Sequence, residues 1–244
     1  MSSSKSRAAE RTARAQQARA EQERAERRRK LLSVGGVVLA MVLVIGVGFL
    51  VQRDRDTSAD VAAPSAGQGD YGVTIGEADA PHDIVIYEDF LCPFCGELEE
   101  ASRADLARLA DEGKVTVEYR PFELLSRISD YSGRATNAFA VVLEESGPEV
   151  AKAFHDLLFE NQPSESGPFP SDEDLVELAV EAGAQEDAVA EGIESGSRSD
   201  WVDEATQAAQ DAGVQGTPTV LLDGEVVNGG SVEEIAELLV AGVE

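Results

Sequence analysis

Histidine and cysteine are scarce in this sequence, which has two of each among 244 residues. The histidines, His82 and His155, lie far apart, and Cys92 and Cys95 form a single C-x₂-C pair. Zinc modules usually add a second C-x₂-C or an H-x₃₋₅-H pair, and this chain has neither. We therefore expect no metal site, and we interpret His155 as a helix residue that packs or caps locally and His82 as a loop residue.

Basic residues are also scarce outside the first 30 positions. Residues 1–30 contain ten Lys or Arg and four Glu, a balance of +6, which leaves −33 for residues 31–244 of the total of −27. A domain with this much negative charge would repel phosphate groups. We therefore exclude nucleic acid as a partner. A solvated, soluble surface is the simpler explanation of the acidity, and an acidic recognition patch is the alternative.

Long apolar runs are absent except at 31–51, which contains no charged residue. As a helix rising about 1.5 Å per residue, this run would match a bilayer of about 30 Å. Basic residues precede it at 27–30, so the positive-inside rule predicts a cytoplasmic N-terminus, with residue 52 onward outside the membrane. A cleaved signal peptide is the alternative, but such apolar regions are shorter and end at a small-residue site that is missing here. Either interpretation places the body where thiols can be oxidised.

The flanking segments complete a four-part organisation. Residues 1–30 are predicted to be a basic cytoplasmic tail, 31–51 a single transmembrane helix, and 52–70 a flexible linker without apolar periodicity. The remaining 71–244 is long enough and apolar enough to form one folded domain.

The pattern within 71–244 predicts an α/β domain. A strand at 84–87 leads to the cysteines, a helix follows from Pro93 to about Gly113, and a second strand covers 115–119. The helix has an apolar stripe that includes Ala101 and is interrupted by Asp105. A helical period then dominates about 131–213. This order closes a sheet if the first two strands are parallel across a right-handed helical crossover.

The C-terminal part returns to strands and ends in a helix. A strand at 219–222 is followed by Asp223-Gly224, a strong hairpin signal, and by a strand at 225–228. A final helix at 232–240 is predicted to begin with a capping box formed by Ser231 and Glu234.

The stretch DFLCPFCGELEE places the cysteine pair where the first strand gives way to a helix. Pro93 suits the first helical position, because its missing N–H would have no helical partner there. The sulfur of Cys92 would face the free N–H groups of Phe94, Cys95 and Gly96 and the positive end of the helix dipole, which stabilise a thiolate. We therefore predict that Cys92 is the nucleophile and that Cys95, one turn along and less exposed, is the resolving cysteine. A structural disulfide remains the alternative, although so small a loop contributes little stability.

Four stretches carry a family resemblance. APHDIVIYEDFLCPFCGE, VEYRPFELL, AFHDLLFENQ and GVQGTPTVLLDG, in this order, resemble the membrane-tethered, DsbA-like branch of the thioredoxin superfamily from about Tyr71 onward. The resemblance implies a thioredoxin fold with an inserted helical subdomain at about 131–213. It also implies a cis peptide bond before Pro218, and a Thr217 backbone that pairs with an extended substrate.

The sequence departs from the family pattern at three places. Family members often have a strand acid where this chain has Ile86, and Glu88 either substitutes for it or is merely solvated at the rim. Phe94 stands where strongly oxidising relatives often have a histidine. Three glutamates, at 97, 99 and 100, are expected to oppose the thiolate of Cys92.

These observations predict a membrane-anchored, extracytoplasmic thiol-disulfide oxidoreductase with no cofactor beyond its redox-active Cys92–Cys95 disulfide. We expect an oxidase that donates this disulfide to exported, unfolded polypeptides, and the resemblance implies a quinone-linked membrane oxidase that restores it. Two alternatives stay open: a reductase or isomerase of exported proteins, and a non-enzymatic anchored module that binds peptides beside Pro218.

Overall fold

The computed structural model describes residues 71–244. The predicted tail, transmembrane helix and linker (1–30, 31–51 and 52–70) lie outside the described residues. Among the helices of 71–244, none is both long and apolar enough to span a bilayer.

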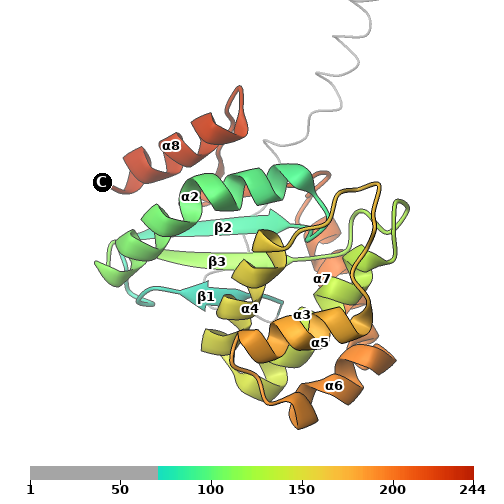
Figure 1. The fold of residues 1–244 in the computed structure, drawn as a ribbon. Helices are drawn as coiled ribbons and strands as arrows, with labels where there is room; N and C mark the ends of the chain where they lie inside the picture. The colour runs from blue at the N-terminus through green and yellow to red at the C-terminus, as the bar shows by residue number, and fades with distance from the viewer. Residues whose placement is uncertain (1–70) are drawn as a thin grey trace, which may run out of the picture. The chain divides into compact units, whose positions relative to one another are not determined.

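Five strands form one sheet in the order β1-β3-β2-β4-β5 (Figure 1). They are β1 (Val73–Ile75), β2 (His82–Glu88), β3 (Val115–Pro121), β4 (Thr219–Leu222) and β5 (Glu225–Val226). β2 and β3 are parallel, and every other pair is antiparallel. The parallel pair and the added hairpin confirm the predicted topology. The sequence pattern missed β1, because three residues are too few to show an alternation.

Helices cover both faces of this sheet. They are α2 (Pro93–Asp111), α3 (Tyr131–Ser146), α4 (Pro148–Glu160), α5 (Asp172–Glu181), α6 (Glu186–Ser195), α7 (Ser199–Asp211) and α8 (Val232–Val243). α2 and α8 lie side by side over one face, and α3 to α7 form the predicted helical insertion between β3 and β4 (Figure 1). The chain therefore has the α/β, thioredoxin-like architecture with an inserted helical subdomain.

β2 is buried on both faces, which explains its continuous apolar run. Ile84 and Ile86 belong to the main core, together with Leu106 of α2, whereas Val85 belongs to a second cluster with Ala209 of α7. The residues that end this strand are therefore held rigidly just before the cysteine pair.

The stripe predicted for α2 needs one correction. Asp105 and Ala101 are exposed, and the buried face uses Ser102 instead, whose hydroxyl donates to the Leu98 carbonyl oxygen at 2.7 Å. A hydroxyl that bonds within its own helix can enter the core, so Asp105 does not interrupt the apolar face.

The structure contains the predicted hairpin turn at Asp223-Gly224 and, in altered form, the predicted cap at the start of α8. Asp223 and Gly224 both have positive φ, 52° and 80°, as the tightest hairpin turn requires. Ser231 Oγ accepts the Glu234 N–H at 3.3 Å, but the Glu234 carboxylate accepts from the Gly230 N–H at 2.6 Å. The start of α8 is therefore capped, although the reciprocal bond goes to the residue before the cap.

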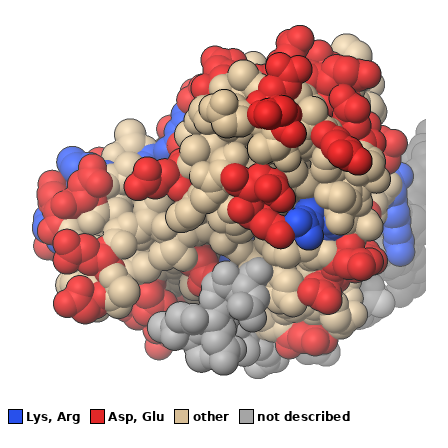
Figure 2. Space-filling view, turned by 90° about the horizontal axis from the view of Figure 1, so that it is seen from below, with Lys and Arg blue, Asp and Glu red and all other residues tan. Residues whose placement is uncertain are grey.

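The surface of the domain is strongly acidic. Figure 2 shows Asp and Glu side chains spread over the face it displays, with few Lys or Arg among them. On that face the acids are dispersed and do not gather into one patch, which favours the solvated-surface interpretation.

Candidate active site

The cysteine pair begins α2. Cys92 is the N-cap residue with extended backbone angles (φ −73°, ψ 116°), and Pro93 follows at the first helical position. Both sulfurs are free thiols, and Cys92 keeps 5% of its surface exposed against 1% for Cys95. Both residues are buried, and Cys92 is the less buried of the two, which agrees with the predicted asymmetry.

The two thiols have opposite acidities. A hydrogen bond from the Cys95 side chain is the main cause that lowers the pKa of Cys92 to about 6, against the opposing effect of burial. The Thr217 side chain and the N–H groups of Cys95 and Phe94 supply further hydrogen bonds that add to this stabilisation of the thiolate. The Gly96 N–H, which we expected to contribute, points instead to the Cys92 carbonyl oxygen at 3.3 Å.

Cys95 shows the reverse behaviour. Burial raises its pKa well above the ordinary value, and its interactions with Cys92 and with the charge of Glu88 raise it further. At neutral pH the reduced pair is therefore one thiolate beside one thiol, which is the arrangement that an attacking and a resolving cysteine need.

Thr217 of the C-terminal Thr-Pro motif contacts Cys92, although the two residues are 125 positions apart in the sequence. The thiol of Cys92 lies 3.4 Å from the Thr217 carbonyl oxygen, to which it donates, and the peptide bond between Thr217 and Pro218 is cis. The structure thus brings together the first and the last of the four stretches that carry the resemblance. Phe94, between the two cysteines, is 56% exposed and supplies no charge.

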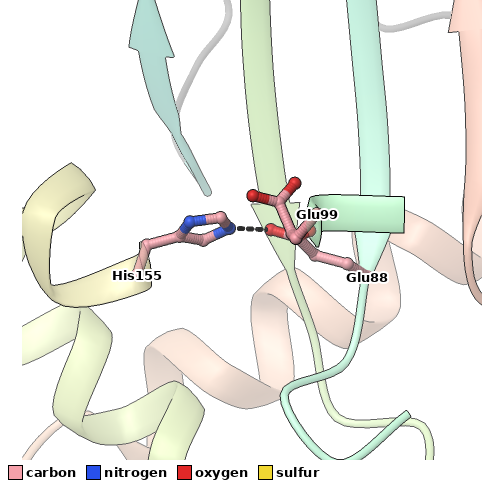
Figure 3. Close-up of side chains that lie close together, drawn as sticks. All are labelled: Glu88, Glu99 and His155. Atoms are coloured by element: carbon pink, nitrogen blue, oxygen red, sulfur yellow. Dashed lines mark hydrogen bonds and ion pairs between the residues drawn. The ribbon is translucent and has the colours of Figure 1, made fainter. Parts of the chain in front are cut away.

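Glu88 is buried, so the solvated alternative for this residue is wrong. It is 1% exposed, and its Oε1 lies 2.5 Å from His155 Nε2 on α4 (Figure 3). His155 is fully buried, and its Nδ1 lies 3.1 Å from Asp156. Burial disfavours the charged imidazole, but Glu88 and Asp156 outweigh that effect and raise the pKa of His155 to about 9. His155 therefore joins the helical insertion to the end of β2. We had expected it only to pack or cap within its own helix, so this long-range contact was not predicted.

Glu99 is the third member of this buried group. It is 1% exposed, and neither of its carboxylate oxygens has a hydrogen-bond partner within residues 71–244. Burial raises the pKa of Glu99 to about 7, although the nearby His155 acts in the opposite direction. Glu99 is therefore not the plain repulsive charge expected from sequence, whereas Glu97 and Glu100 are exposed.

Asp89 is a site residue that the sequence analysis missed. Its buried carboxylate accepts hydrogen bonds from four donors, which are Leu91 N, Leu124 N and Leu125 N, each at 2.8 Å, and Ser132 Oγ at 2.6 Å. It therefore joins the loop before the cysteines to the loop after β3 and to α3. Its position after an apolar strand was the only signal in the sequence.

Gln162 is a second residue that was missed. Its Nε2 donates to the carbonyl oxygens of Phe90 at 3.0 Å and Cys92 at 2.9 Å. A side chain at Gly96 would collide with it, since a Cβ there would lie 2.5 Å from Gln162 Oε1. The chain just after α4 therefore supports the redox turn directly.

The atoms of Glu88, Glu99 and His155 that could hold a metal ion lie within 4.8 Å of one another. Glu88 and His155 are already paired, and Lys152 and Arg103 supply further positive charge nearby. The cysteines and histidines do not converge, because His82 begins β2 and pairs with Asp223 at 2.8 Å. The length of β2 therefore separates His82 by about 20 Å from the strand end that leads to the cysteines. We assign no metal to this site.

A groove of about 500 Å³ lies beside the redox turn. It is lined by Pro93, Gly96, Glu97, Glu99, Glu100, Arg103, Phe159, Glu160 and Gln162. Residues of α2 form one side of it, and residues at and just after the end of α4 form the other.

The thiolate of Cys92 gives a direct prediction. Because its pKa is lowered, the thiolate absorbance of the reduced protein should rise with a midpoint near pH 6, and the nucleophile should be lost as the pH falls through that value. The Cys92→Ser variant is the control and should lack this transition, because the pKa of Cys95 lies far higher. A midpoint near the free-thiol value of about 8.5 would show that Cys92 is not activated.

Comparisons with known proteins agree with this geometry. A family model described as Thioredoxin matches residues 68–241. The reduced DsbA of Mycobacterium tuberculosis is 29% identical, with 71% of this chain and 99% of that chain covered at a TM-score of 0.57. MdbA of Actinomyces oris, a thiol-disulfide oxidoreductase, is 26% identical, with 74% and 93% covered at a TM-score of 0.59.

A curated relative of another kind is the serine/threonine-protein kinase PknE of Mycobacterium tuberculosis. It is 28% identical over an alignment of 166 residues that covers 64% of this chain and 29% of the kinase. The chain therefore spans less than a third of the length of that relative.

Proposed function

Because this chain belongs to the thioredoxin family, we propose that it is a DsbA-like thiol-disulfide oxidoreductase that donates its Cys92–Cys95 disulfide to exported proteins. One observation carries the proposal. A sulfur of low pKa, in a residue that keeps 5% of its surface exposed, begins a helix beside the Thr217 backbone, and a more deeply buried thiol of high pKa lies one turn along. That pairing of acidities is what disulfide transfer requires and a structural disulfide does not.

The donating reaction has two exchanges. A substrate thiolate attacks the sulfur of Cys92, a mixed disulfide forms, and Cys95 leaves with the electron pair of the broken S–S bond and takes up a proton. A second substrate thiolate then attacks the first substrate sulfur, and Cys92 leaves as a thiolate, which its low pKa stabilises. Two electrons pass from the substrate to the cysteine pair, and the substrate gains a disulfide.

Thr217 and Pro218 are proposed to hold the substrate during this reaction. The Thr217 backbone lies against Cys92, and an extended peptide that pairs with it would place its own sulfur near the nucleophile. Pro218 supplies neither an N–H nor a ligating side chain, so it leaves the thiolate free to react.

The cellular setting belongs to the same proposal. Residues 31–51 anchor the chain in the cell membrane, 1–30 stay in the cytoplasm, and 52–70 tether the catalytic domain outside. The pair then meets exported, reduced polypeptides and returns its electrons to a membrane oxidase, because Cys92 and Cys95 are the only cysteines of the chain and each turnover leaves them reduced.

The acidity of Cys92 supports donation over reduction. At pH 7 a thiol of pKa about 6 is about nine-tenths ionised, whereas one near 9 is about one-hundredth ionised. Ionisation therefore lowers the share of un-ionised Cys92 thiol from nearly all to about one-tenth. This stabilises the reduced pair about tenfold, or by about 1.4 kcal/mol, which makes the disulfide more oxidising by about 30 mV.

Refolding of ribonuclease tests the direction. The oxidised full-length chain in detergent should restore activity to reduced, unfolded ribonuclease, and its potential should lie nearer to about −120 mV than to about −270 mV. The matched assay is the reduction of insulin by the reduced chain. If insulin is reduced readily while ribonuclease gains no disulfides, the protein is a reductase.

A further inference from the structure

Gln162 lies just after the end of α4, in the helical insertion, and its side chain reaches the turn that leads into the nucleophile. The amide nitrogen donates to the Phe90 carbonyl oxygen at 3.0 Å and to the Cys92 carbonyl oxygen at 2.9 Å. A carboxamide has two N–H donors, so both are used on this turn. One side chain therefore bridges the two ends of the turn 90–92.

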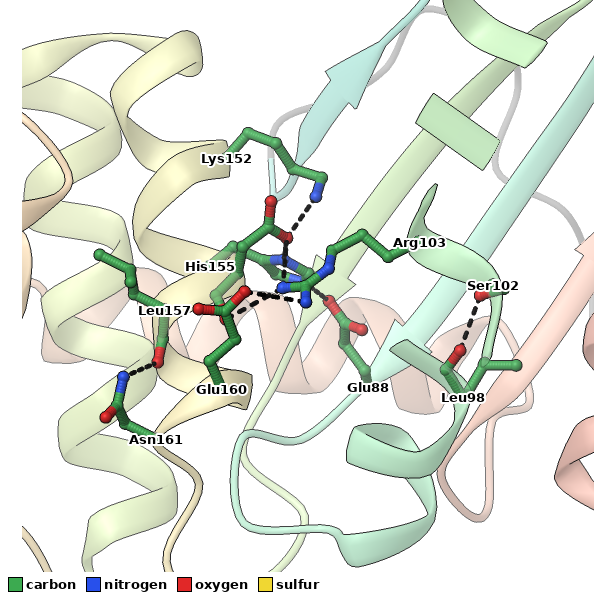
Figure 4. A network of polar contacts seen from close by, with 10 residues as sticks. Glu88, Leu98, Ser102, Arg103, Lys152, His155, Leu157, Glu160 and Asn161 are labelled. Atoms are coloured by element: carbon green, nitrogen blue, oxygen red, sulfur yellow. Dashed lines mark hydrogen bonds and ion pairs between the residues drawn. The ribbon is translucent and has the colours of Figure 1, made fainter. Parts of the chain in front are cut away.

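The segment that carries Gln162 is itself fixed in place. Glu160, two positions earlier, lies 2.9 Å from Arg103 of α2 (Figure 4). The ring of Phe159, on α4, packs against the ring of Phe90 with 5.2 Å between their centroids. The Gln162 N–H donates to the Phe159 carbonyl oxygen at 3.2 Å. The amide therefore approaches the turn from a backbone position that an ion pair and aromatic packing hold.

Gly96 is independent evidence for this contact. It is the fourth residue of α2, where alanine is normally preferred, and its φ is not in the left-handed region that favours glycine. A Cβ at this position would lie 2.5 Å from Gln162 Oε1 and 3.2 Å from Gln162 Cδ. The amide would have to shift to make room for a methyl group, and the shift would disturb its two bonds to the turn. Space for Gln162 therefore accounts for the glycine.

The Cys92 carbonyl, which Gln162 holds, is the part of the turn that orients the nucleophile. It also accepts the Cys95 N–H at 3.0 Å and the Gly96 N–H at 3.3 Å, and so begins the hydrogen bonding of α2. Its direction fixes the peptide plane that follows Cys92, and with it the angle at which the sulfur faces the N–H groups of Phe94 and Cys95. Those two N–H groups stabilise the thiolate. A group that holds this carbonyl therefore controls how well they do so.

We propose that Gln162 is the positioning residue of the nucleophile, and that it holds the turn 90–92 in the orientation in which the first N–H groups of α2 face the Cys92 sulfur. The helical insertion thus tunes the redox pair through one side chain. The inference rests on the proposed function, since it concerns the nucleophile of the same exchange, and it adds a residue outside the cysteine and Thr-Pro motifs.

The Gln162→Ala variant of the reduced full-length chain tests the proposal. Without the two bonds the N–H groups should stabilise the thiolate less well, so the midpoint of the thiolate absorbance should rise from about pH 6 by about one pH unit. At pH 7 the stabilisation of the reduced pair by ionisation would then fall from about elevenfold to about twofold. The equilibrium constant for reduction of the disulfide by glutathione should therefore be about fivefold lower. Cys95, the titratable group that contacts the sulfur, is unchanged in this variant.

Two further variants separate the hydrogen bonds from the bulk of the side chain. Gln162→Glu keeps the shape, but an ionised carboxylate has no N–H to donate, so the midpoint should rise at least as far as in Gln162→Ala. Gly96→Ala should raise the midpoint by displacing the amide. In the double variant Gly96→Ala/Gln162→Ala the methyl group has room, so the shift should equal that of Gln162→Ala and not the sum of the two.

Asn161→Ala is the matched control. Asn161 is the neighbouring amide, and its Nδ2 donates to the Leu157 carbonyl oxygen of α4 at 2.9 Å in an exposed place (Figure 4). Loss of this bond should leave the thiolate midpoint and the glutathione equilibrium as in the wild type. A merely structural role of Gln162 predicts the same pattern for Gln162→Ala, with a lower melting temperature and an unchanged midpoint, and that result would overturn the proposal.

A measurement on the wild type keeps the proposal testable if the variants fail to fold. In nitrogen-15 spectra of the reduced chain, the side-chain NH₂ signals of Gln162 should shift with the midpoint of the Cys92 thiolate, near pH 6. Signals that stay constant through that transition, or shifts that add in the double variant, would contradict the assigned role. If the wild-type chain has a thiolate midpoint near about 8.5 and exchanges with no thiol, it is the proposed function that fails.

Discussion

The Cys92→Ser variant is expected to lose essentially all thiol-disulfide exchange while it keeps its fold and its binding of unfolded peptides. Serine preserves the N-cap position that Cys92 occupies, so the helix start should persist, whereas a hydroxyl does not form the mixed disulfide. The measurements are ribonuclease refolding, insulin reduction and peptide binding on one preparation. Unchanged binding with abolished exchange supports the enzyme, and a wild-type chain that binds peptides without any exchange would establish the peptide-binding module instead.

The companion variant Cys95→Ser should accumulate mixed disulfides. Cys92 keeps its low pKa and the more exposed of the two positions, but no second sulfur is present to displace the bound substrate. These adducts are detected on non-reducing gels of whole cells and should disappear with a thiol reductant. If the adducts form through Cys95 in the Cys92→Ser chain, the assigned roles are reversed.

The Asp89→Ala variant is expected to lose about 3 to 5 kcal/mol of unfolding free energy, because three backbone N–H groups and one hydroxyl lose their shared acceptor inside the protein. The loss should also loosen the redox turn, since the Leu91 N–H is one of those donors. Urea denaturation of the reduced chain measures the change, and a rise of the Cys92 midpoint above about pH 6 reports the local effect.

Asp111→Ala is the control for this experiment. Asp111 is exposed in the last turn of α2, so its removal should change stability by no more than about 0.5 kcal/mol. An Asp89→Ala chain as stable as this control would mean that the four hydrogen bonds do not organise the site.

The order of the elements followed from the sequence because local signals were strong and mutually consistent. A buried apolar strand, Pro93 at a helix start and Asp223-Gly224 at a hairpin each limit the backbone within a few residues. The cysteine spacing predicted the redox pair for the same reason. The three-residue β1 could not be predicted, because it is a strand through its pairing with β3 and has no recognisable pattern of its own.

The charged residues show where sequence reasoning stopped. Glu88, Glu99 and Asp89 resemble ordinary solvated acids in the sequence, and all three are buried. His155 lies 67 positions from the carboxylate that it pairs with, so no local period relates the two. Burial and partners come from packing between distant segments, and they set the sign and size of each pKa shift.

The sequence by itself determined the chemistry available to this protein: two sulfurs three positions apart at a helix start, a late Thr-Pro motif and an α/β order of elements, since these depend on short-range backbone geometry. Only the tertiary structure decided which groups surround those sulfurs. It placed Thr217 against Cys92 and buried a histidine and two glutamates beneath the pair, because the electrostatics of an interior depend on what long-range packing excludes from water.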